Sequence, residues 1–437
     1  MPHPRAVDLL AGLAGLGLGA TVAFDLLAES TTTLSAPGGM MTAAGRLTGM
    51  IGTYMLLMVV LLVGRIPALE RVIGQDKLIA WHRKLGPYSL VLLTAHGVLI
   101  TLGYAQAARN GFLRQIGTLT TSYPGMLTAI VALIALIAAG VTSYRIARRR
   151  MKYETWWIVH LYTYLAVALS YSHQLATGTP FIGHPIARTF WIGLYLLTLG
   201  VVLSFRVALP VWRSMRHQLR VVAIHAEAPG VISIVCRGRK LNRLPVAGGQ
   251  FMQWRFLSAG EWWQAHPYSL SALPTETLMR VTIKDLGDQS GGLPHIKLGT
   301  RVAIEGPYGA LTHHARVARH VLLVGAGVGV TPLRAMLEDL PADVSADMIV
   351  RASSAEDLVL RGELATLIAR RGGHMHELVG SRRHIPLDAQ QVHQLVPDIA
   401  QRDVFVCGPE GFMQGFLNSA RQLGVPEQQL HHEDYAF

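Results

Sequence analysis

The sequence predicts a membrane α-helical bundle of six transmembrane helices, followed by a small antiparallel β-barrel and then an α/β domain. Six long apolar segments fill the first 210 residues, short strands with turn signals follow residue 217, and a hydrophobic strand runs into a glycine-rich turn near residue 325. A mean hydropathy of +0.33 over 437 residues is too high for a soluble protein and too low for a chain lying wholly in a bilayer. The predicted domain boundaries are 1–215, 216–315 and 316–437.

Each apolar segment is long enough to cross about 30 Å of hydrocarbon as an α-helix. The six predicted spans are 7–27, 46–64, 82–104, 124–144, 155–175 and 187–209. Lysine and arginine gather before the third span, between the fourth and fifth, and after the sixth. The opposite loops hold only Arg46, Arg109, Arg114 and Arg188. The positive-inside rule therefore predicts a multi-pass protein of the plasma (inner) membrane, with both termini and the two later domains in the cytoplasm.

The location of the positive charges also indicates whether they interact with nucleic acid or with the lipid bilayer. A net charge of +12 would suit nucleic acid if it formed one basic patch on a soluble domain. Here much of the charge flanks the apolar segments, which favours the lipid bilayer and argues against nucleic acid. The only cysteines, Cys236 and Cys407, both fall in the predicted cytoplasmic part, where we expect no disulfide.

Four histidines lie in the apolar segments as two pairs. His82 and His96 are 14 residues apart in the third span, and His160 and His173 are 13 apart in the fifth. An imidazole in hydrocarbon needs a partner for its lone pair. Hydrogen bonds between helices are one possibility, and zinc is disfavoured because nearby Cys, Asp and Glu ligands are missing. Two matched pairs favour bis-histidine haem, with His82 opposite His160 at an inner site and His96 opposite His173 at an outer site, at levels separated by roughly 20 Å.

The spacing of each pair sets the direction of its rings. At 100° per residue, His96 returns to within about 40° of His82, whereas His173 points about 140° away from His160. The fifth span would therefore need a 3₁₀ turn or a bend to aim both rings at one helix. Gly86 and Gly97 would leave room for a flat macrocycle against the third span.

The strands after residue 217 contain the segment His266-Pro267-Tyr268-Ser269. Tyr268 offers a ring to stack on a flavin, and Ser269 offers a hydroxyl to the ring nitrogens. By itself the segment would be a strand-edge turn, but a small polar loop some twenty residues later can open a helix whose N–H groups hold phosphate. The two features together favour FAD. The candidate FAD residues are His266, Pro267, Tyr268, Ser269, Lys284, Gly287, Gln289 and Ser290.

The third predicted domain begins with a buried strand, 320–324, that runs into a glycine-rich turn over 325–332. Such turns let a pyrophosphate approach the backbone. The next strand ends at Arg351, where arginine suits a 2′-phosphate, so NADPH is favoured over NADH, with Arg382 or Arg383 assisting. A solvated surface arginine is the alternative. A third strand, 404–406, leads to the loop where nicotinamide should lie. The candidate nucleotide residues are Gly325, Gly327, Gly329, Thr331, Pro332, Arg351, Arg382, Cys407, Gly408 and Pro409.

Taken together, these motifs resemble those of the NADPH oxidase and ferric reductase transmembrane superfamily, in its bacterial form. The histidine spacings of 14 and 13, with their angular offset, are similar to the family pattern, and His266-Pro267-Tyr268-Ser269 resembles its flavin motif. The resemblance implies a ferredoxin-NADP-reductase-like arrangement after the bundle, and two haem b, FAD and NADPH (NADH possible) as cofactors. It also implies that the terminal aromatic, Phe437, covers the flavin and yields to nicotinamide, with Glu433 and Cys407 as further catalytic candidates.

The resemblance also suggests an acceptor. Arg46, 19 residues before Arg65, matches an arginine that lies by the outer haem in the oxidases, where positive charge stabilises superoxide. The alternative is an interfacial arginine that reaches water, and Ile100 stands where those oxidases carry a histidine. The expected function is a transmembrane NADPH oxidase that passes electrons through FAD and two haems to extracytoplasmic O₂, producing superoxide.

Two alternatives remain for the acceptor: ferric chelates reduced by the same electron path, or a partner protein outside that the chain supplies with electrons. The sequence contains no calcium-binding loop and no proline-rich docking segment, so no obligatory protein activator is expected.

Overall fold

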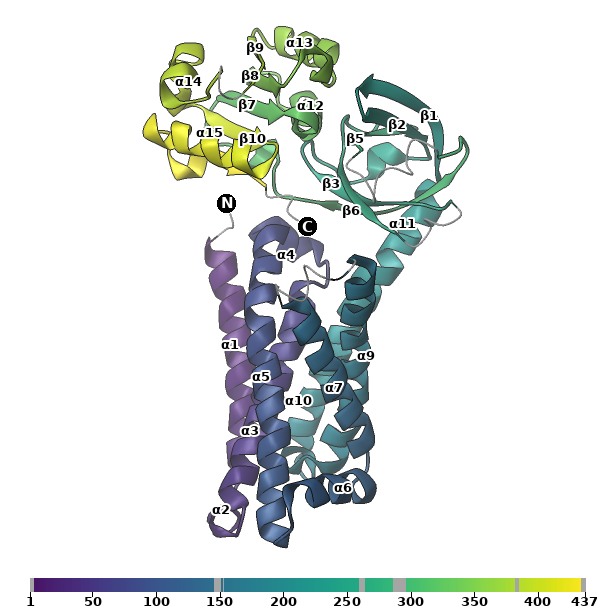
Figure 1. Ribbon diagram of the computed structural model, residues 1–437, viewed down its shortest axis with the longest axis vertical. Helices are drawn as coiled ribbons and strands as arrows, with labels where there is room; N and C mark the ends of the chain where they lie inside the picture. Colours follow the sequence, from purple (N-terminus) through teal and green to yellow (C-terminus); the bar gives the residue numbers. More distant parts are fainter. Residues whose placement is uncertain are drawn as a thin grey trace. The chain divides into compact units, whose positions relative to one another are not determined.

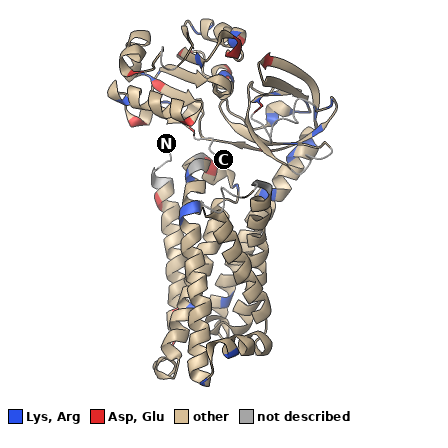
Figure 2. Cartoon of the chain, in the orientation of Figure 1, with Lys and Arg blue, Asp and Glu red and all other residues tan. Residues whose placement is uncertain are grey.

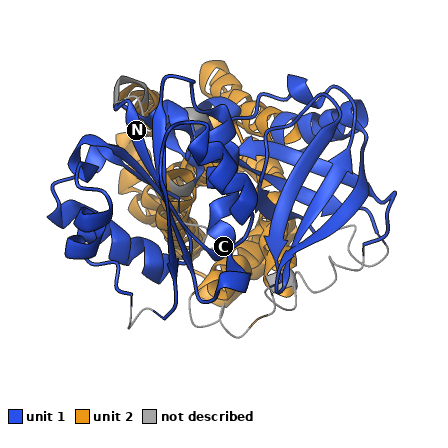
Figure 3. Ribbon diagram, turned by 90° about the horizontal axis from the view of Figure 1, so that it is seen from above, with its two compact units in different colours: residues 1–2, 67–76, 204–437 blue, residues 3–66, 77–203 orange. Residues whose placement is uncertain are grey.

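The computed structural model describes residues 4–144, 151, 153–258, 264–285, 296–381 and 385–433. The chain divides into two compact units, one made of residues 3–66 and 77–203 and the other mainly of residues 204–437, which Figure 3 shows in different colours. Each unit contains its own clusters of buried hydrophobic side chains.

The first unit is a bundle of long helices (Figure 1). These are α1 (Pro4–Leu27), α3 (Gly39–Leu62), α5 (Gln75–Ala108), α7 (Met126–Ser143), α9 (Tyr153–Thr177) and α10 (Pro185–Val201). Two short helices, α2 (Thr31–Ser35) and α6 (Phe112–Ser122), lie at one end of the bundle, and the 3₁₀ helix η1 (Thr179–Phe181) follows α9. Figure 2 shows few charged residues along the long helices, as expected for helices that face hydrocarbon.

Within the described part of the chain, five helices are long and apolar enough to cross a membrane. They are Val7–Leu27, Gly39–Leu62, Lys77–Ala108, Met126–Ser143 and Pro185–His217. The remaining predicted span, 155–175, falls on α9, which is 25 residues long and packs along α7. Two histidines and several tyrosines lower the mean hydropathy of α9. A helix that carries polar functional groups inside a bundle is expected to be less apolar than its neighbours. The last span continues from α10 through a π-helix, η2 (Val202–Ala208), into α11 (Leu209–His217).

The second unit contains an antiparallel sheet and also the short helix α4 (Pro67–Ile73). Its strands are β1 (Leu219–Ala228), β2 (Val231–Arg237), β3 (Phe251–Phe256), β4 (His266–Ser269), β5 (Leu278–Lys284) and β6 (Arg301–Tyr308). The strand order is β4-β3-β6-β1-β2-β5, and a bridge between Leu270 and Val281 joins the two outer strands. The sheet therefore closes on itself, around buried side chains that include Met252 and Trp254.

A parallel sheet follows in the same unit. It consists of β7 (His320–Ala326), β8 (Ser345–Ala352), β9 (Met375–Val379), β10 (Asp403–Cys407) and β11 (Leu430–His432), in the order β11-β10-β7-β8-β9. Val321 and Leu323 of β7 face helices α12 (Val330–Asp339) and α13 (Arg361–Ala369), and Leu322 and Val324 face α14 (Ala389–Leu395) and α15 (Glu410–Gln422). Helices on both faces explain why β7 is hydrophobic without alternation. The loops at the carboxyl ends of β7, β8 and β10 meet at one edge, where such sheets bind ligands.

Candidate functional site

The four bundle histidines face one another in the two predicted pairs. The ring centroids of His82 on α5 and His160 on α9 are 5.9 Å apart, and those of His96 and His173 are 6.4 Å apart. Two metal–nitrogen bonds of about 2 Å, with about 1.2 Å from each nitrogen to its ring centre, would place two coaxial imidazoles about 6.4 Å apart. Both separations are therefore close to what one metal ion held between two imidazoles requires.

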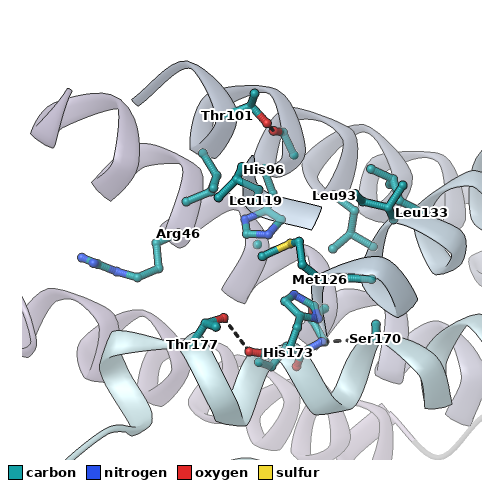
Figure 4. Close-up of a pocket in the computed structure, with 18 of the residues that line it drawn as sticks. Arg46, Leu93, His96, Thr101, Leu119, Met126, Leu133, Ser170, His173 and Thr177 are labelled. Carbon is teal, nitrogen blue, oxygen red and sulfur yellow. Dashed lines mark hydrogen bonds between the residues drawn. The ribbon is translucent and has the colours of Figure 1, made fainter. Parts of the chain in front are cut away.

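Hydrogen bonds to backbone carbonyls fix the ring orientation of the two histidines on α5. His82 Nδ1 lies 3.0 Å from the carbonyl oxygen of Val59, and His96 Nδ1 lies 2.7 Å from that of Gly45. A carbonyl oxygen only accepts, so each Nδ1 must carry the proton and donate, which leaves the lone pair on Nε2. The ring of His173 lies beside the backbone of Ser170, but its buried Nδ1 has no hydrogen-bond partner of good geometry among the described residues (Figure 4). His160 Nδ1 lies 3.3 Å from the hydroxyl of Ser143. Such outer partners are typical of metal-bound histidine.

Glycines on α3 allow α5 to approach closely enough for this arrangement. A Cβ atom on Gly49 would lie 2.4 Å from His96 Nδ1, and one on Gly45 would lie 2.8 Å from the backbone of Ile100. Gly86 has open space around it, whereas a Cβ atom on Gly97 would lie 3.1 Å from the side chain of Leu133. The 3₁₀ turn or bend expected in the fifth span does not show in its hydrogen bonding, because α9 is α-helical from Tyr153 to Thr177.

A cavity of about 450 Å³ lies beside His96 and His173 (Figure 4). Its wall combines residues of six helices and η1, including Thr101 of α5, Met126 of α7 and Trp191 of α10. The volume falls within the roughly 300–1,000 Å³ of typical cofactor pockets. A haem held by His96 and His173 fits these observations: a mostly apolar space, two facing imidazoles and an Nε2 lone pair on His96 that the Gly45 carbonyl leaves available. His82 and His160 have the same donor set.

Arg46 lines this cavity, but its charge is not free. Arg46 Nε lies 3.0 Å from Asp25 Oδ1, and the guanidinium also contacts Glu29. Asp25 is 1% exposed, and the side chain of Arg46 is 12% exposed. The expected position beside the outer histidine pair is therefore found, whereas the alternative of an arginine that reaches water does not fit this burial. The expected role as an unpaired positive charge needs correction, because the guanidinium is paired with two acidic side chains.

The predicted flavin segment forms strand β4 of the barrel. His266 is buried and stacks on Tyr268 with ring centroids 5.7 Å apart, and the carbonyl of Tyr268 accepts a hydrogen bond from Trp254 Nε1 at 3.2 Å. Burial lowers the pKa of His266 below 6.5, so at neutral pH this imidazole carries no charge. Pro267 and Ser269 lie in the same strand, and Lys284 is exposed at the end of β5.

The two predicted nicotinamide loops lie against each other. Strand β7 runs through the 3₁₀ turn η6 (Gly327–Gly329) into α12, whose first turn contains Thr331 and Pro332. A Cβ atom on Gly329 would lie 2.5 Å from the carbonyl oxygen of Cys407, and one on Gly408 would lie 3.1 Å from Ala326. Only glycine permits this contact, which joins the phosphate turn to the Cys407–Pro409 loop. Gly325 is required for a different reason, because its Cβ would lie 2.7 Å from Val330.

Arg351 occupies the predicted place at the end of β8 but is engaged with the protein itself. The residue is 8% exposed, and its guanidinium donates to the carbonyl oxygens of Ile385 at 2.6 Å and Gly380 at 3.2 Å. The alternative of a solvated surface arginine is wrong. In this structure the guanidinium holds the backbone at Gly380 and Ile385. A bound 2′-phosphate would compete with these two hydrogen bonds.

Several candidate residues lie outside the described residues. They are Gly287, Gln289, Ser290, Arg382, Arg383 and Phe437. Glu433, the last described residue, is buried. Its carboxylate lies close to Gly309, on which a Cβ atom would come within 3.0 Å of Glu433 Oε2.

Two parts of the bundle site were missed from the sequence. Helix α6 closes part of the cavity with Phe112, Ile116 and Leu119, whose spacing of three to four residues already indicates one apolar helix face. Asp25, which pairs with Arg46, lies in the first apolar span. An acidic residue in such a span is a signal of function that could have been followed.

Comparison with known proteins agrees with this arrangement. Residues 48–171 match the family model of a ferric reductase like transmembrane component, and residues 218–312 match an FAD-binding domain. The class of protein is therefore a multi-pass, ferric-reductase-like membrane flavoprotein. The chain belongs to the NADPH oxidase and ferric reductase superfamily.

Several proteins are similar to part of this chain. An NADPH oxidoreductase of Mycobacterium tuberculosis is 26% identical over 241 residues, which cover 53% of this chain and 63% of that protein. A flavohemoprotein of Vibrio cholerae is 30% identical over 178 residues, covering 38% of this chain and 45% of that protein. The chain thus spans less than two thirds of the length of these relatives. The FAD/NAD binding domain of a nitric oxide dioxygenase from Vibrio cholerae is 24% identical, with a TM-score of 0.42 over 50% of this chain and 97% of that one.

Proposed function

We propose that this chain is a transmembrane NADPH oxidase. Electrons from cytosolic NADPH pass through bound FAD and two b-type haems and reduce O₂ on the opposite side of the membrane to superoxide. The observation that carries this proposal is the two pairs of facing imidazoles, in each of which the α5 histidine keeps its Nε2 lone pair available. Six spans, with α9 as the fifth, and the positive-inside orientation complete the proposal.

In the proposed function, different elements of the chain bind the haems, the flavin and the nucleotide. When bound, FAD accepts a hydride and releases single electrons, and each haem iron relays one electron at a time. His82 with His160, and His96 with His173, hold the two irons on two helices that cross the bilayer. Tyr268 and Ser269 orient the flavin ring, and the turn over Gly325–Gly329 holds the nucleotide pyrophosphate against the start of α12. The Cys407–Pro409 loop directs the nicotinamide.

The composition of the cavity supports O₂ as the acceptor. Among its described lining residues, Arg46 is the only one with a full charge, and Asp25 and Glu29 offset that charge. A small uncharged acceptor enters apolar surroundings at little cost, whereas a charged ferric chelate loses hydration there.

One assay on the purified full-length protein in lipid nanodiscs tests the proposal. The reduced-minus-oxidised spectrum should show low-spin haem, and NADPH should drive reduction of cytochrome c that superoxide dismutase blocks. A colourless preparation would exclude the haem assignment. Dismutase-insensitive reduction of ferric citrate, at a rate above that of O₂ consumption, would instead assign the chain to ferric-chelate reduction. Turnover that needs an added protein from the opposite compartment would assign it to electron supply.

A further inference from the structure

A network of charged side chains connects the barrel to the parallel-sheet domain within the second unit. Arg280 of β5 binds Glu363 of α13 through two parallel hydrogen bonds of 2.7 and 2.8 Å. Glu363 Oε2 also accepts a hydrogen bond from Arg334 Nε of α12 at 2.7 Å, and Arg334 pairs with Glu338 at 2.7 Å. Two cations and two carboxylates alternate, so the network carries no net charge.

The barrel end of this network holds the segment that follows the flavin strand. Arg280 donates to the hydroxyl of Ser271 at 3.2 Å and to its carbonyl at 3.1 Å, two residues beyond Ser269. Glu338 Oε2 accepts a hydrogen bond from the backbone N–H of Leu273 at 2.7 Å. Ser271 is fully buried and lies in a chain of hydroxyls with Thr282 at 2.8 Å and then Ser233 at 2.7 Å. The network is thus anchored in the barrel core.

The other end holds the helix that begins at the phosphate turn. Arg334 is 8% exposed and lies two residues after Pro332, in α12. Its two acidic partners come from α12 itself and from α13. A shift of α12 relative to the flavin strand would therefore break several charge-assisted hydrogen bonds at once.

We propose that Arg280, Glu363, Arg334 and Glu338 are positioning residues that set the spacing between the flavin and the nicotinamide. The proposal rests on the proposed function, because it assumes a flavin on β4 and a nucleotide at the start of α12. Hydride transfer demands reacting atoms within about 3–3.5 Å, and a misplacement of about 1 Å can cost 100-fold in rate. A link that joins the two binding elements directly, and not through the cofactors, controls that distance.

The same helix supplies a matched control. Arg361 and Glu377 form an equally short bidentate pair, at 2.7 Å for both bonds, but join α13 to β9 inside the parallel-sheet domain. Glu363→Gln and Glu377→Gln therefore each remove one carboxylate that accepts a bidentate pair of hydrogen bonds from an arginine, and only Glu363→Gln affects the link to the barrel.

The test is stopped-flow reduction of the flavin by NADPH in full-length protein, with nucleotide affinity measured separately. Glu363→Gln should slow flavin reduction at saturating NADPH about tenfold or more, raise the isotope effect with 4-deuterated nucleotide, and change nucleotide Kd less than threefold. Glu377→Gln should match the wild type. If Glu363→Gln loses FAD, Glu338→Gln, which removes only the Leu273 and Arg334 contacts, should show the same split between rate and affinity. Wild-type rates in both Glu363→Gln and Glu338→Gln would overturn the proposal. A wild-type flavin that NADPH does not reduce would instead overturn the proposed function.

Discussion

At the scale of single residues, the hydrogen-bond partner of Nδ1 determines whether a histidine of the bundle can bind a metal through Nε2. A carbonyl oxygen on Nδ1 holds His82 and His96 in the tautomer that coordinates a metal through Nε2. The same ring paired with a donor would present the wrong nitrogen. The identity of the residue was readable from the sequence, but its tautomer needed the backbone of another helix.

The outer pair can be tested by one substitution. His96→Leu removes one of two ligands, so we expect it to lose one of two haems and to stop O₂ reduction, while NADPH still reduces the flavin. The absorbance of the Soret band per mole of protein should fall by about half. His184→Leu, which alters an exposed histidine before α10, is the control and should keep both haems. Retention of both haems in His96→Leu would contradict the ligand assignment.

Arg351 separates a nucleotide-binding role from a structural one. Because its guanidinium already bonds to the carbonyls of Ile385 and Gly380, we expect Arg351→Ala to weaken NADPH and NADH to a similar degree and to lower thermal stability. Two bonds from a buried charged group contribute roughly 1.5–3 kcal/mol each. Binding constants for both nucleotides, with melting curves, decide the matter. A loss confined to NADPH would support contact with the 2′-phosphate.

At the scale of elements, the close contact of α3 with α5 depends on small residues. Gly45 and Gly49 form a small-xxx-small pattern, which lets two membrane helices approach until backbone and ring touch. The carbonyl of Gly45 then reaches His96. The small residues of α3 therefore explain both the close contact between α3 and α5 and the orientation of the His96 ring.

Gly49→Ala is expected to disrupt the outer haem site selectively. The added methyl would occupy space 2.4 Å from His96 Nδ1, so the ring must turn away from Gly45. The variant should lose most of the outer haem and keep the inner one, as measured by haem content and by redox titration. Gly193→Ala in α10 adds the same methyl where no atom lies within 4 Å, and it should behave as the wild type. Equal haem content in both variants would mean that α3 does not position His96.

At the scale of the whole molecule, the second unit depends on the charged link between its two sheets. The hydrogen bonds from Arg280 hold the pKa of Glu363 below its ordinary value of 4.5. A lowered folded-state pKa means that this stabilisation is complete above pH 4.5 and is lost as the pH falls through the lower value. Stability should therefore decrease on acidification through this window.

The pH dependence can be measured on the full-length protein in detergent. Melting temperatures of the wild type should exceed those of Glu363→Gln at pH 7 by about 2–4 °C, and the difference should shrink below pH 4.5. Glu377→Gln, whose pair is more exposed, should differ little from the wild type at either pH. A difference between wild type and Glu363→Gln that stays constant down to pH 3.5 would show that Glu363 does not titrate in this range.

The sequence by itself determined the classes of element, because hydrophobic length and period depend on neighbours along the chain. It determined the apolar helices, the change from helices to strands near residue 217, the histidine levels and the glycine turn at the end of β7. What each side chain meets depended on the tertiary structure. The pairing of Arg46 with Asp25 and Glu29, the bonds of Arg351, the α6 wall of the cavity and the link from Arg280 to Glu363 all join residues distant in sequence. Such contacts follow from how the elements pack, and a local pattern does not encode them.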